Sequence, residues 1–477
     1  MAKFGNVNGR RDKKKDKYLM EKSTNKKEID MLNGPLAGKL IFFALPLAFS
    51  SILQQLFNSA DVAIVGKFCG DNSLAAVGAN VAIVGVFVNL VVGLSVGPNA
   101  ALANLIGSGK KSGIHDMEHT AIGFGALLGF LLMLIGIVTA KPVLELSGTP
   151  EEIMAAALKY IYIYFIGMPF IVIYNFAAAV LRSFGDTKRP MYVLFLTGVI
   201  NVVLNLFFVI VCDLDVAGVA IATTISNIIS AAAVIIFLCR DEGEFKLHLR
   251  QLEIKKSQLR KMLQIGIPTG VSSAVFSLSN IFIQSGINTF GADAIAGSSL
   301  ELTFEYFSYD ITSAFAQTAV TFMSQNYGAG KLRRCNKIFC MCLAFGFLFA
   351  QLLSTIFLIG QDFFIYIYTS SASVAAYAAV RLHFIGGLEG FTATYEVGGS
   401  GMRAFGKSLE PAIITILGTV GFRLLWLVTV FKTIHTFESL MAVYMTSWIL
   451  TGGTILFLYF RLYKRLLKEH EGSVCEA

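Results

Sequence analysis

The sequence has little charge for its length. Only 15% of its 477 residues are Asp, Glu, Lys or Arg, whereas charged residues make up about a quarter of a soluble domain. At the same time 55% of the residues are hydrophobic, and the mean hydropathy is +0.66. A soluble fold would have no interior large enough for so much apolar surface. The composition therefore argues against an ordinary soluble enzyme and predicts that lipid surrounds most of the chain.

Cysteine and catalytic motifs are also scarce. The seven cysteines form no CxxC pair and have no metal-type spacing to histidine, which argues against a disulfide framework or a structural zinc site. No GxxxxGK(S/T) loop is present, so direct use of ATP is not expected. The histidines form no HExxH motif or catalytic grouping: His115, His119, His248, His383, His435 and His470. We therefore predict no enzyme activity, no resident metal and no cofactor besides a coupling ion.

Long apolar runs are what the sequence has in abundance. About 20 helical residues are needed to cross the hydrocarbon of a bilayer, and twelve runs reach this length. Their continuous apolar character excludes the alternating strands of a β-barrel. The sequence predicts an all-α integral membrane protein with twelve transmembrane helices, at 40–66, 75–106, 120–140, 154–181, 190–211, 215–239, 262–289, 294–326, 336–360, 372–402, 410–431 and 438–463.

The positive charges divide unequally between the two sides of these spans. If the N-terminal tail lies on one side and successive loops alternate between the two sides, 33 of the 39 Lys and Arg residues fall on the side of the tail. Three fall on the other side: Lys67, Lys141 and Lys432. Positive residues favour the cytoplasm, so both termini are predicted to be cytoplasmic, in a bacterial inner membrane. Nucleic acid is not expected as a partner. The tail has no apolar segment typical of a signal peptide, and its RRDKKKDK cluster is expected to contact anionic lipid.

The chain repeats itself at an offset of about 221 residues. An R-x-F-G-x4-P motif begins at Arg182 and again at Arg403, and the Gly-rich segments that begin at Gly107 and Gly328 also correspond. These glycines are expected to end long helices, because glycine tolerates positive φ. Two parallel six-helix repeats are predicted, with a substrate path between them. The domain boundaries are a basic tail 1–35, a first bundle 36–240, an amphipathic, helical cytoplasmic linker 241–261, a second bundle 262–463 and a cytoplasmic tail 464–477.

Several segments together resemble one transporter family. They are GPLAGKLIFFALPLAFSSILQQLFNSADVAIVG, LRSFGDTKRP, INVVLNLFFVI and MSQNYGAGK. In register across twelve spans they are similar to the multidrug and toxic compound extrusion (MATE) family, closest to its DinF-like branch, over residues 34–465. The resemblance implies two six-helix bundles in a V shape. It also implies efflux of cationic or amphipathic compounds, coupled by alternating access to inward flow of H⁺ or Na⁺.

The first bundle contains one acid well inside a span, Asp61. An ionisable group in the membrane is a functional hypothesis by default, and Asp61 matches the position of a cation-binding or proton-binding aspartate in the family. Asn201 and Asn205 share a helical face at i and i+4, and with Thr223 they match further positions of that site. The family often has Asp where this chain has Asn205, so one negative charge is missing. Asn175 is expected either to join this cluster or to form an interhelical hydrogen bond.

The second bundle carries more acids. Glu301 and Glu305 share a face at i and i+4, and Glu389 and Glu396 share one at i and i+7. Two interpretations remain open. These acids, with Asp310, line a substrate cavity in which Phe304, Tyr306, Phe307 and Tyr309 offer aromatic faces to a cation. Alternatively, Arg381 neutralises Glu389 or Glu301 as a structural pair and the aromatics face lipid. Arg423 is expected to be a structural partner of a carboxylate or carbonyl.

These patterns predict a monomeric, secondary-active multidrug exporter. H⁺ or Na⁺ would bind at Asp61 from outside, shift the equilibrium between outward-open and inward-open states, and lower the affinity for the cationic or amphipathic substrate. The alternative is a flippase for lipid-linked oligosaccharides from the same superfamily, which would need a cavity rich in Arg and Lys. A membrane-embedded enzyme would need a cluster of His, Asp or Cys, which the sequence does not suggest.

Overall fold

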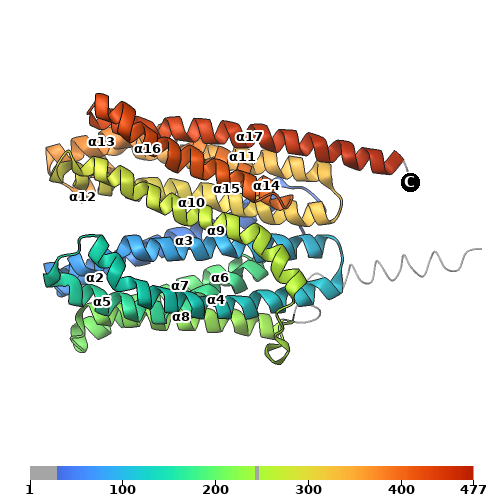
Figure 1. Cartoon of the computed structure of the whole chain (residues 1–477), viewed down its shortest axis with the longest axis horizontal. Helices are drawn as coiled ribbons and strands as arrows, with labels where there is room; N and C mark the ends of the chain where they lie inside the picture. Colours follow the sequence, from blue (N-terminus) through green and yellow to red (C-terminus); the bar gives the residue numbers. More distant parts are fainter. Residues whose placement is uncertain (1–28, 242–245, 476–477) are drawn as a thin grey trace, which may run out of the picture.

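The computed structural model describes residues 29–241 and 246–475, which are predominantly helical. Long helices lie side by side in a single thick layer of membrane-spanning length (Figure 1). The first half of the chain contains α2 (Ala37–Phe68), α3 (Asp71–Gly107), α4 (Lys111–Leu146), α5 (Glu151–Ile166), α6 (Met168–Ser183), α7 (Lys188–Leu206), which continues as a π-helical turn (Phe207–Val211), and α8 (Asp215–Arg240).

The second half contains α9 (Lys256–Asn288), α10 (Ala292–Gly328), α11 (Leu332–Ile359), α12 (Gln361–Tyr368), α13 (Ala372–Gly386), a 3-10 turn (Glu389–Phe391), α14 (Thr392–Ala404), α15 (Leu409–Thr415), α16 (Phe422–Trp426), which lies between π-helical turns (Ile416–Gly421 and Leu427–Phe431), and α17 (Phe437–Cys475). The twelve helical segments of the two halves correspond to the twelve predicted spans. The fold class is therefore confirmed.

Two of the twelve segments are less apolar than the rest. Within the described part of the chain, nine helices are long and apolar enough to cross a membrane, and α5 with α6, bent by 43°, make a tenth. The remaining predicted spans, 294–326 and 372–402, correspond to α10, which carries four acids, and to the segment from α13 to α14, which breaks after Gly386. Glu301 of α10 is nevertheless buried. Arg381 and Glu389 of the other segment are buried as well, so these three charged groups lie against other parts of the protein.

The two halves of the chain form two helix bundles that meet through a few helices. In Figure 1 the blue-to-green half lies below the yellow-to-red half, with α3 and α9 between them. α3 packs along α9 and α10, and α2 packs along α10. Glycine allows this close approach: a Cβ on Gly97 would lie 2.3 Å from the Met262 carbonyl oxygen, and one on Gly93 would lie 2.6 Å from the Gly270 Cα. Side chains at these positions would force the halves apart.

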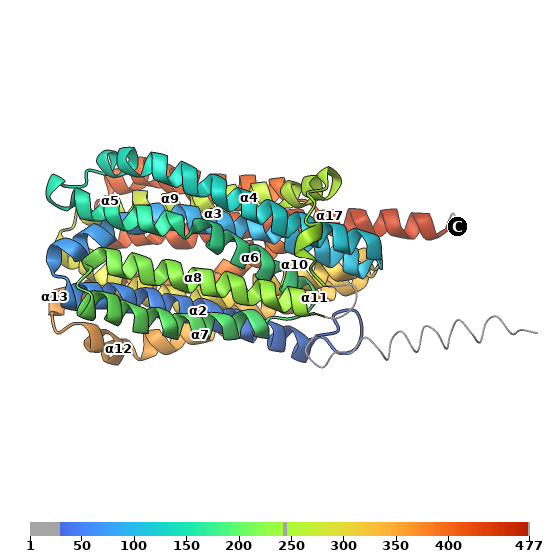
Figure 2. The ribbon, with the colours of Figure 1, turned by 90° about the horizontal axis from the view of Figure 1, so that it is seen from below.

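The repeated glycines at the ends of α3 and α10 have two different tasks. Gly109 and Gly330 have φ of 68° and 72° and end their helices as predicted. Gly107 and Gly328 do not have positive φ and instead touch the other half, because a Cβ on Gly328 would lie 2.1 Å from the Asn104 carbonyl oxygen. These contacts lie at the end of the molecule that also holds the loop 183–188 and the linker. We call this end the basic face, because most described loop cations gather there; α17 runs past the other helices on this side (Figure 2).

The prediction of an amphipathic helix across the linker 241–261 was wrong for residues 246–255, and only 256–261 are α-helical, as the first turns of α9. Residues 246–255, which we call the linker strap, contain one 3-10 turn (Leu249–Gln251) and otherwise irregular backbone. The strap lies on α4, whose side chains replace helical hydrogen bonds. The Lys255 amide donates to the Thr120 hydroxyl (3.1 Å), and the Lys255 ammonium pairs with Asp116 (2.8 Å). Binding to α4 therefore determines the linker's shape.

A corresponding strap precedes the first bundle. Residues 29–34, the N-terminal strap, cross from one half of the chain to the other at the basic face. The Ile29 amide donates to the Gly185 carbonyl of the first half, while Asn326 of the second half donates to the Met31 carbonyl (3.1 Å). Met31 is buried in the core of the second bundle. The RRDKKKDK cluster, for which lipid contact is predicted, lies outside the described residues.

Candidate functional site

The first cluster of embedded polar groups is centred on Asp61, which lies two turns before the end of α2. Its carboxylate faces α7 and α8. Asn205 donates to Oδ1 of Asp61 at 2.5 Å, and the Thr223 hydroxyl donates to Oδ2 at 3.4 Å. The cluster lies toward the face opposite the basic face, because all three residues are near the ends of their helices on that side. Three helices therefore position one partly buried carboxylate.

Asn201 and Asn205 complete this cluster from one face of α7, as their spacing predicts. The Asn205 amide also lies 3.3 Å from Oδ1 of Asn201, and the Asn201 amide donates to the Thr223 hydroxyl at 3.3 Å. Asn205 is fully buried, and its Oδ1 has no hydrogen-bond partner among the described residues. The site thus offers a carboxylate and a free amide oxygen, which are the oxygen ligands that hard cations prefer.

Asn175 does not join this cluster. Its side-chain amide donates to the Ile171 carbonyl of the same helix, α6, at 2.8 Å. Among the described residues Asn175 neither joins the cluster nor forms an interhelical hydrogen bond, because its amide donates within its own helix. Sequence reasoning instead overlooked Tyr160 and Tyr164 of α5, which pack in the apolar cluster that includes Ile64 of α2. Their i, i+4 spacing on an apolar helix resembles ordinary core packing.

The second cluster is built around Arg381 of α13. Its Nε donates to Glu301 at 2.5 Å, and its terminal nitrogen donates to Glu305 at 2.7 Å. The two glutamates share a face of α10, as predicted. The Arg381 and Glu301 side chains are 3% and 1% exposed, and that of Glu305 is 16% exposed. Because one guanidinium serves two carboxylates, the trio carries a net negative charge when both acids are ionised.

Glu389 is the least satisfied acid of this region. It lies in the 3-10 turn between α13 and α14 and is 1% exposed. Neither of its carboxylate oxygens has a hydrogen-bond partner in the described chain. The expected pairing of Arg381 with Glu301 is present, whereas Arg381 makes no hydrogen bond to Glu389. A buried acid without a partner is costly to keep ionised, which makes this position a functional candidate.

Glu396 and Asp310 are surrounded differently. The Tyr309 hydroxyl donates to the Glu396 carboxylate at 2.7 Å, while Asp310 is partly buried and forms no ion pair within the described residues. Glu389 lies in the 3-10 turn that runs directly into α14, the helix of Glu396, so their common face stays a prediction. The two carboxylates nevertheless have different environments.

The aromatic groups divide between packing and ionic contacts. Phe304 stacks on Phe357 of α11 with ring centroids 4.9 Å apart, so it is a core residue rather than a cavity face. Arg423 lies 4.4 Å from the centre of the Tyr444 ring and donates to the Asn280 amide oxygen at 3.2 Å, as expected for a structural partner. Arg381 lies 5.5 Å from the same ring. Tyr444 thus connects the two embedded arginines.

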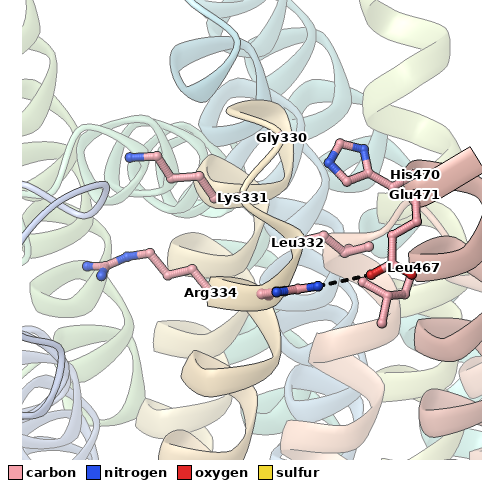
Figure 3. Close-up of a pocket in the computed structure, with 8 residues that line it drawn as sticks. Gly330, Lys331, Leu332, Arg334, Leu467, His470 and Glu471 are labelled. Carbon is pink, nitrogen blue, oxygen red and sulfur yellow. Dashed lines mark hydrogen bonds and ion pairs between the residues drawn. The ribbon is translucent and has the colours of Figure 1, made fainter. Parts of the chain in front are cut away.

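A surface hollow of about 430 Å³ lies at the basic face, away from both clusters. Figure 3 shows it between the start of α11 and the end of α17. Arg333, which also lines the hollow, forms an ion pair of 3.1 Å with Glu471. Lys331 points away from it and donates to the Leu32 carbonyl of the N-terminal strap. The hollow therefore lies among groups that fasten the chain ends and does not connect with the embedded acids.

Three histidines that the sequence analysis left ungrouped come together at the basic face. His115 and His119 lie one turn apart at the start of α4, and His248 lies in the linker strap. One nitrogen from each ring lies within 4.8 Å of the others. Sequence spacing could not indicate this grouping, because the residues between His119 and His248 include most of the first bundle.

Comparison with known proteins gives a consistent result. The sequence model of the MatE family matches residues 46–207 and 268–428. The probable multidrug resistance protein YoeA of Bacillus subtilis is 28% identical over 261 residues, which is 53% of this chain and 56% of that protein. The probable multidrug resistance protein NorM of Thermotoga maritima is 24% identical over 80% of this chain and 82% of its own length. The multidrug export protein MepA of Staphylococcus aureus is 21% identical over 88% and 96%.

Solved structures show the same fold. An outward-facing conformation of a multidrug resistance MATE family transporter superposes with a TM-score of 0.84 at 20% identity, covering 94% of this chain and 99% of the other. A MATE structure in complex with MaL6 gives a TM-score of 0.86 at 19% identity, covering 92% and 98%. The arrangement of the two bundles is therefore that of these transporters.

Proposed function

Since the chain belongs to the MatE family, we propose that it is a secondary-active exporter, and not an enzyme, that moves cationic or amphipathic small molecules in exchange for H⁺ or Na⁺. The observation that carries the proposal is the Asp61 carboxylate, held between α2, α7 and α8 by Asn205 and Thr223. Relatives named as multidrug export proteins support the substrate class. Assignment to the DinF-like branch stays a prediction.

The coupling ion acts at the cluster of Asp61, Asn201, Asn205 and Thr223. A proton or Na⁺ would neutralise Asp61 and compete with the hydrogen bonds that now join it to α7 and α8. Those bonds cross between helices, so their strength depends on how the helices pack. An ion that binds more tightly to one packing than to another shifts the equilibrium between outward-open and inward-open states. The unpartnered Asn205 oxygen supports Na⁺ as one option.

The substrate is attracted by the acids of the second bundle. Glu301, Glu305 and Glu389 outnumber their nearest cation, Arg381. Since Arg381 engages Glu301 and Glu305, we propose that Glu389 is the acid with which a cationic substrate pairs, because the substrate supplies the partner that Glu389 lacks, with Glu396 and Asp310 as further cavity acids. A cavity that binds cations for export needs such an excess of acidic over basic side chains. A flippase for pyrophosphate-linked lipids would need the opposite charge, so the observed acids argue against that alternative.

The molecule is oriented by its loop charges. We propose that the basic face lies in the cytoplasm and that the protein works as a monomer in the cell membrane. The close glycine contacts between α3, α9 and α10 join the halves at and near this face. We infer that the cytoplasmic side is closed in this arrangement and that the ion reaches Asp61 from the outer side. Alternating access then requires these contacts to separate.

The test is transport by the purified full chain in liposomes. We expect uptake or release of a fluorescent organic cation to follow an imposed H⁺ gradient or an imposed Na⁺ gradient, which also identifies the coupling ion. Asp61→Asn should abolish coupled transport, whereas Asp71→Asn, at an exposed site on the same side of the membrane, should retain it. Wild-type coupling in Asp61→Asn would disprove the coupling role. Movement of labelled lipid-linked sugar without cation transport would favour the flippase.

A further inference from the structure

Three histidines from separate parts of the chain lie together on the basic face. His115 and His119 occupy successive turns of α4, with their ring centroids 3.9 Å apart. The ring of His248, in the linker strap, lies 6.3 Å from that of His119 and 6.1 Å from that of His115. Candidate ligand nitrogens from the three side chains all lie within 4.8 Å of one another. We propose that this trio binds a divalent transition metal of the zinc class and thereby fastens the linker strap to α4.

The hydrogen bonds of His119 orient it for this role. Its Nδ1 lies 2.9 Å from the His115 carbonyl oxygen, which can only accept, so Nδ1 carries the proton. Its Nε2 accepts the backbone amide of His248 at 3.1 Å, so Nε2 carries the lone pair. Metal-binding histidines commonly donate one ring N–H to a carbonyl, which fixes the tautomer and directs the other nitrogen at the metal. His119 is therefore pre-oriented toward the linker strap.

The geometry requires only a small rearrangement. Tetrahedral zinc with bonds of about 2.0–2.1 Å brings its ligand nitrogens to roughly 3.4 Å from one another. His119 is buried and well fixed, His115 is half-buried, and His248 is exposed and can turn its ring. The metal would take the Nε2 lone pair of His119 in exchange for the His248 amide hydrogen bond. Three imidazoles with a water in the fourth position suit zinc, copper, nickel and cobalt rather than magnesium or calcium.

The location gives the site a structural consequence. The linker strap joins the two bundles and already contacts α4 through Thr120 and through the ion pair between Lys255 and Asp116. A bound metal would add a strong connection between this strap and the first bundle. It would thus hold the linker in the conformation seen here. This inference concerns metal binding and linker order, and it stands independently of the proposed transport activity.

The experiment measures metal binding by the purified full chain, without a polyhistidine tag and after treatment with a chelator. Calorimetric titration with ZnCl₂ should give one site per chain, and Co²⁺ should give the visible absorption of a tetrahedral complex. We expect His248→Ala and His115→Gln each to weaken Zn²⁺ binding at least about tenfold. His383→Ala, which removes a ring that bonds the Ala379 carbonyl of its own helix, is the matched control. Undiminished binding in the His115→Gln, His248→Ala double variant would overturn the proposal, as would no binding in the wild type.

A second measurement tests directly whether the metal orders the linker strap. Trypsin cleavage after Arg250 or Lys256, identified by mass spectrometry, should slow several-fold when Zn²⁺ is added to the wild-type protein. The same addition should have no effect on His248→Ala, which keeps the backbone amide and therefore the hydrogen bond to His119. Equal protection of both proteins by Zn²⁺ would overturn the proposal. Neither measurement uses transport, so its failure is distinct from a failure of the proposed function.

Discussion

A Cβ atom on Gly107 would lie 1.8 Å from the carbonyl oxygen of Gln325. Gly107 ends α3 in the first bundle, and Gln325 lies in the last turn of α10 in the second bundle. The repeat-related contact is also present, because a Cβ on Gly328 would lie 2.1 Å from the Asn104 carbonyl oxygen. At the basic face the two halves therefore meet backbone against backbone, through glycines at corresponding positions of the repeat.

This contact predicts an unusual effect of alanine. Gly107→Ala should destabilise the present arrangement by about 1–3 kcal/mol, since the added methyl group overlaps backbone that cannot turn away. Gly85→Ala, in the same helix, should be neutral or stabilising by up to about 1 kcal/mol, because its Cβ meets nothing within 4 Å. Thermal unfolding in detergent measures both. Equal melting temperatures for the two variants would show that the halves separate without cost at Gly107.

Restoring the second carboxylate should strengthen cation binding at Asp61. In Asn205→Asp a second acid would lie within contact distance of Asp61. We expect the Na⁺ concentration for half-maximal transport to fall about tenfold, because two carboxylates attract a cation more strongly than one. Asn175→Asp makes the same chemical change outside the cluster and should leave the Na⁺ dependence unchanged. A similar effect of both variants would mean that general negative charge, and not this site, is responsible.

Removing Arg381 should be severely destabilising. Arg381→Gln leaves Glu301 and Glu305 buried without their shared cation, which typically costs about 3–5 kcal/mol. The double variant with Glu301→Gln should recover part of the loss. Arg333→Gln breaks an exposed ion pair with Glu471 and should change stability by less than about 1 kcal/mol. Chemical denaturation or thermal melting distinguishes these cases, and similar losses for Arg381→Gln and Arg333→Gln would contradict the pairing.

Replacing Glu389 should lower the affinity for substrate without destabilising the fold. Glu389→Gln has nearly the same shape and removes a buried acid that has no partner among the described residues, so the melting temperature should stay the same or rise. We expect the apparent affinity for a dicationic substrate to fall about tenfold, since an amide cannot form the ion pair that the carboxylate forms with a bound cation. Glu410→Gln, on the exposed basic face, serves as the control. Unchanged affinity in Glu389→Gln, with normal folding, would remove Glu389 from the substrate cavity.

The sequence predicted the fold well because the membrane imposes simple rules. Apolar length and the position of Lys and Arg were enough to locate twelve segments, including α10, which is less apolar than the other long helices of the described chain. The i, i+4 spacing also placed Asn201 and Asn205 on one face, and Glu301 and Glu305 on another. The helix prediction for the linker strap was wrong. Its charged sequence pattern is typical of a helix, but α4 provides alternative hydrogen bonds for its backbone.

The sequence by itself determined that lipid surrounds most of the chain, that its two halves repeat, and which acids lie inside the spans. These features follow from local composition and from matching motifs along the chain. Only the tertiary structure decided which groups meet. Arg381 contacts acids 76 and 80 residues away, and His119 contacts a residue 129 positions away. Helix packing sets such contacts, and many pairings satisfy the same local pattern. Tertiary structure thus made Arg381 a partner of Glu301 and Glu305, left Glu389 unpaired, and assembled three histidines into one group.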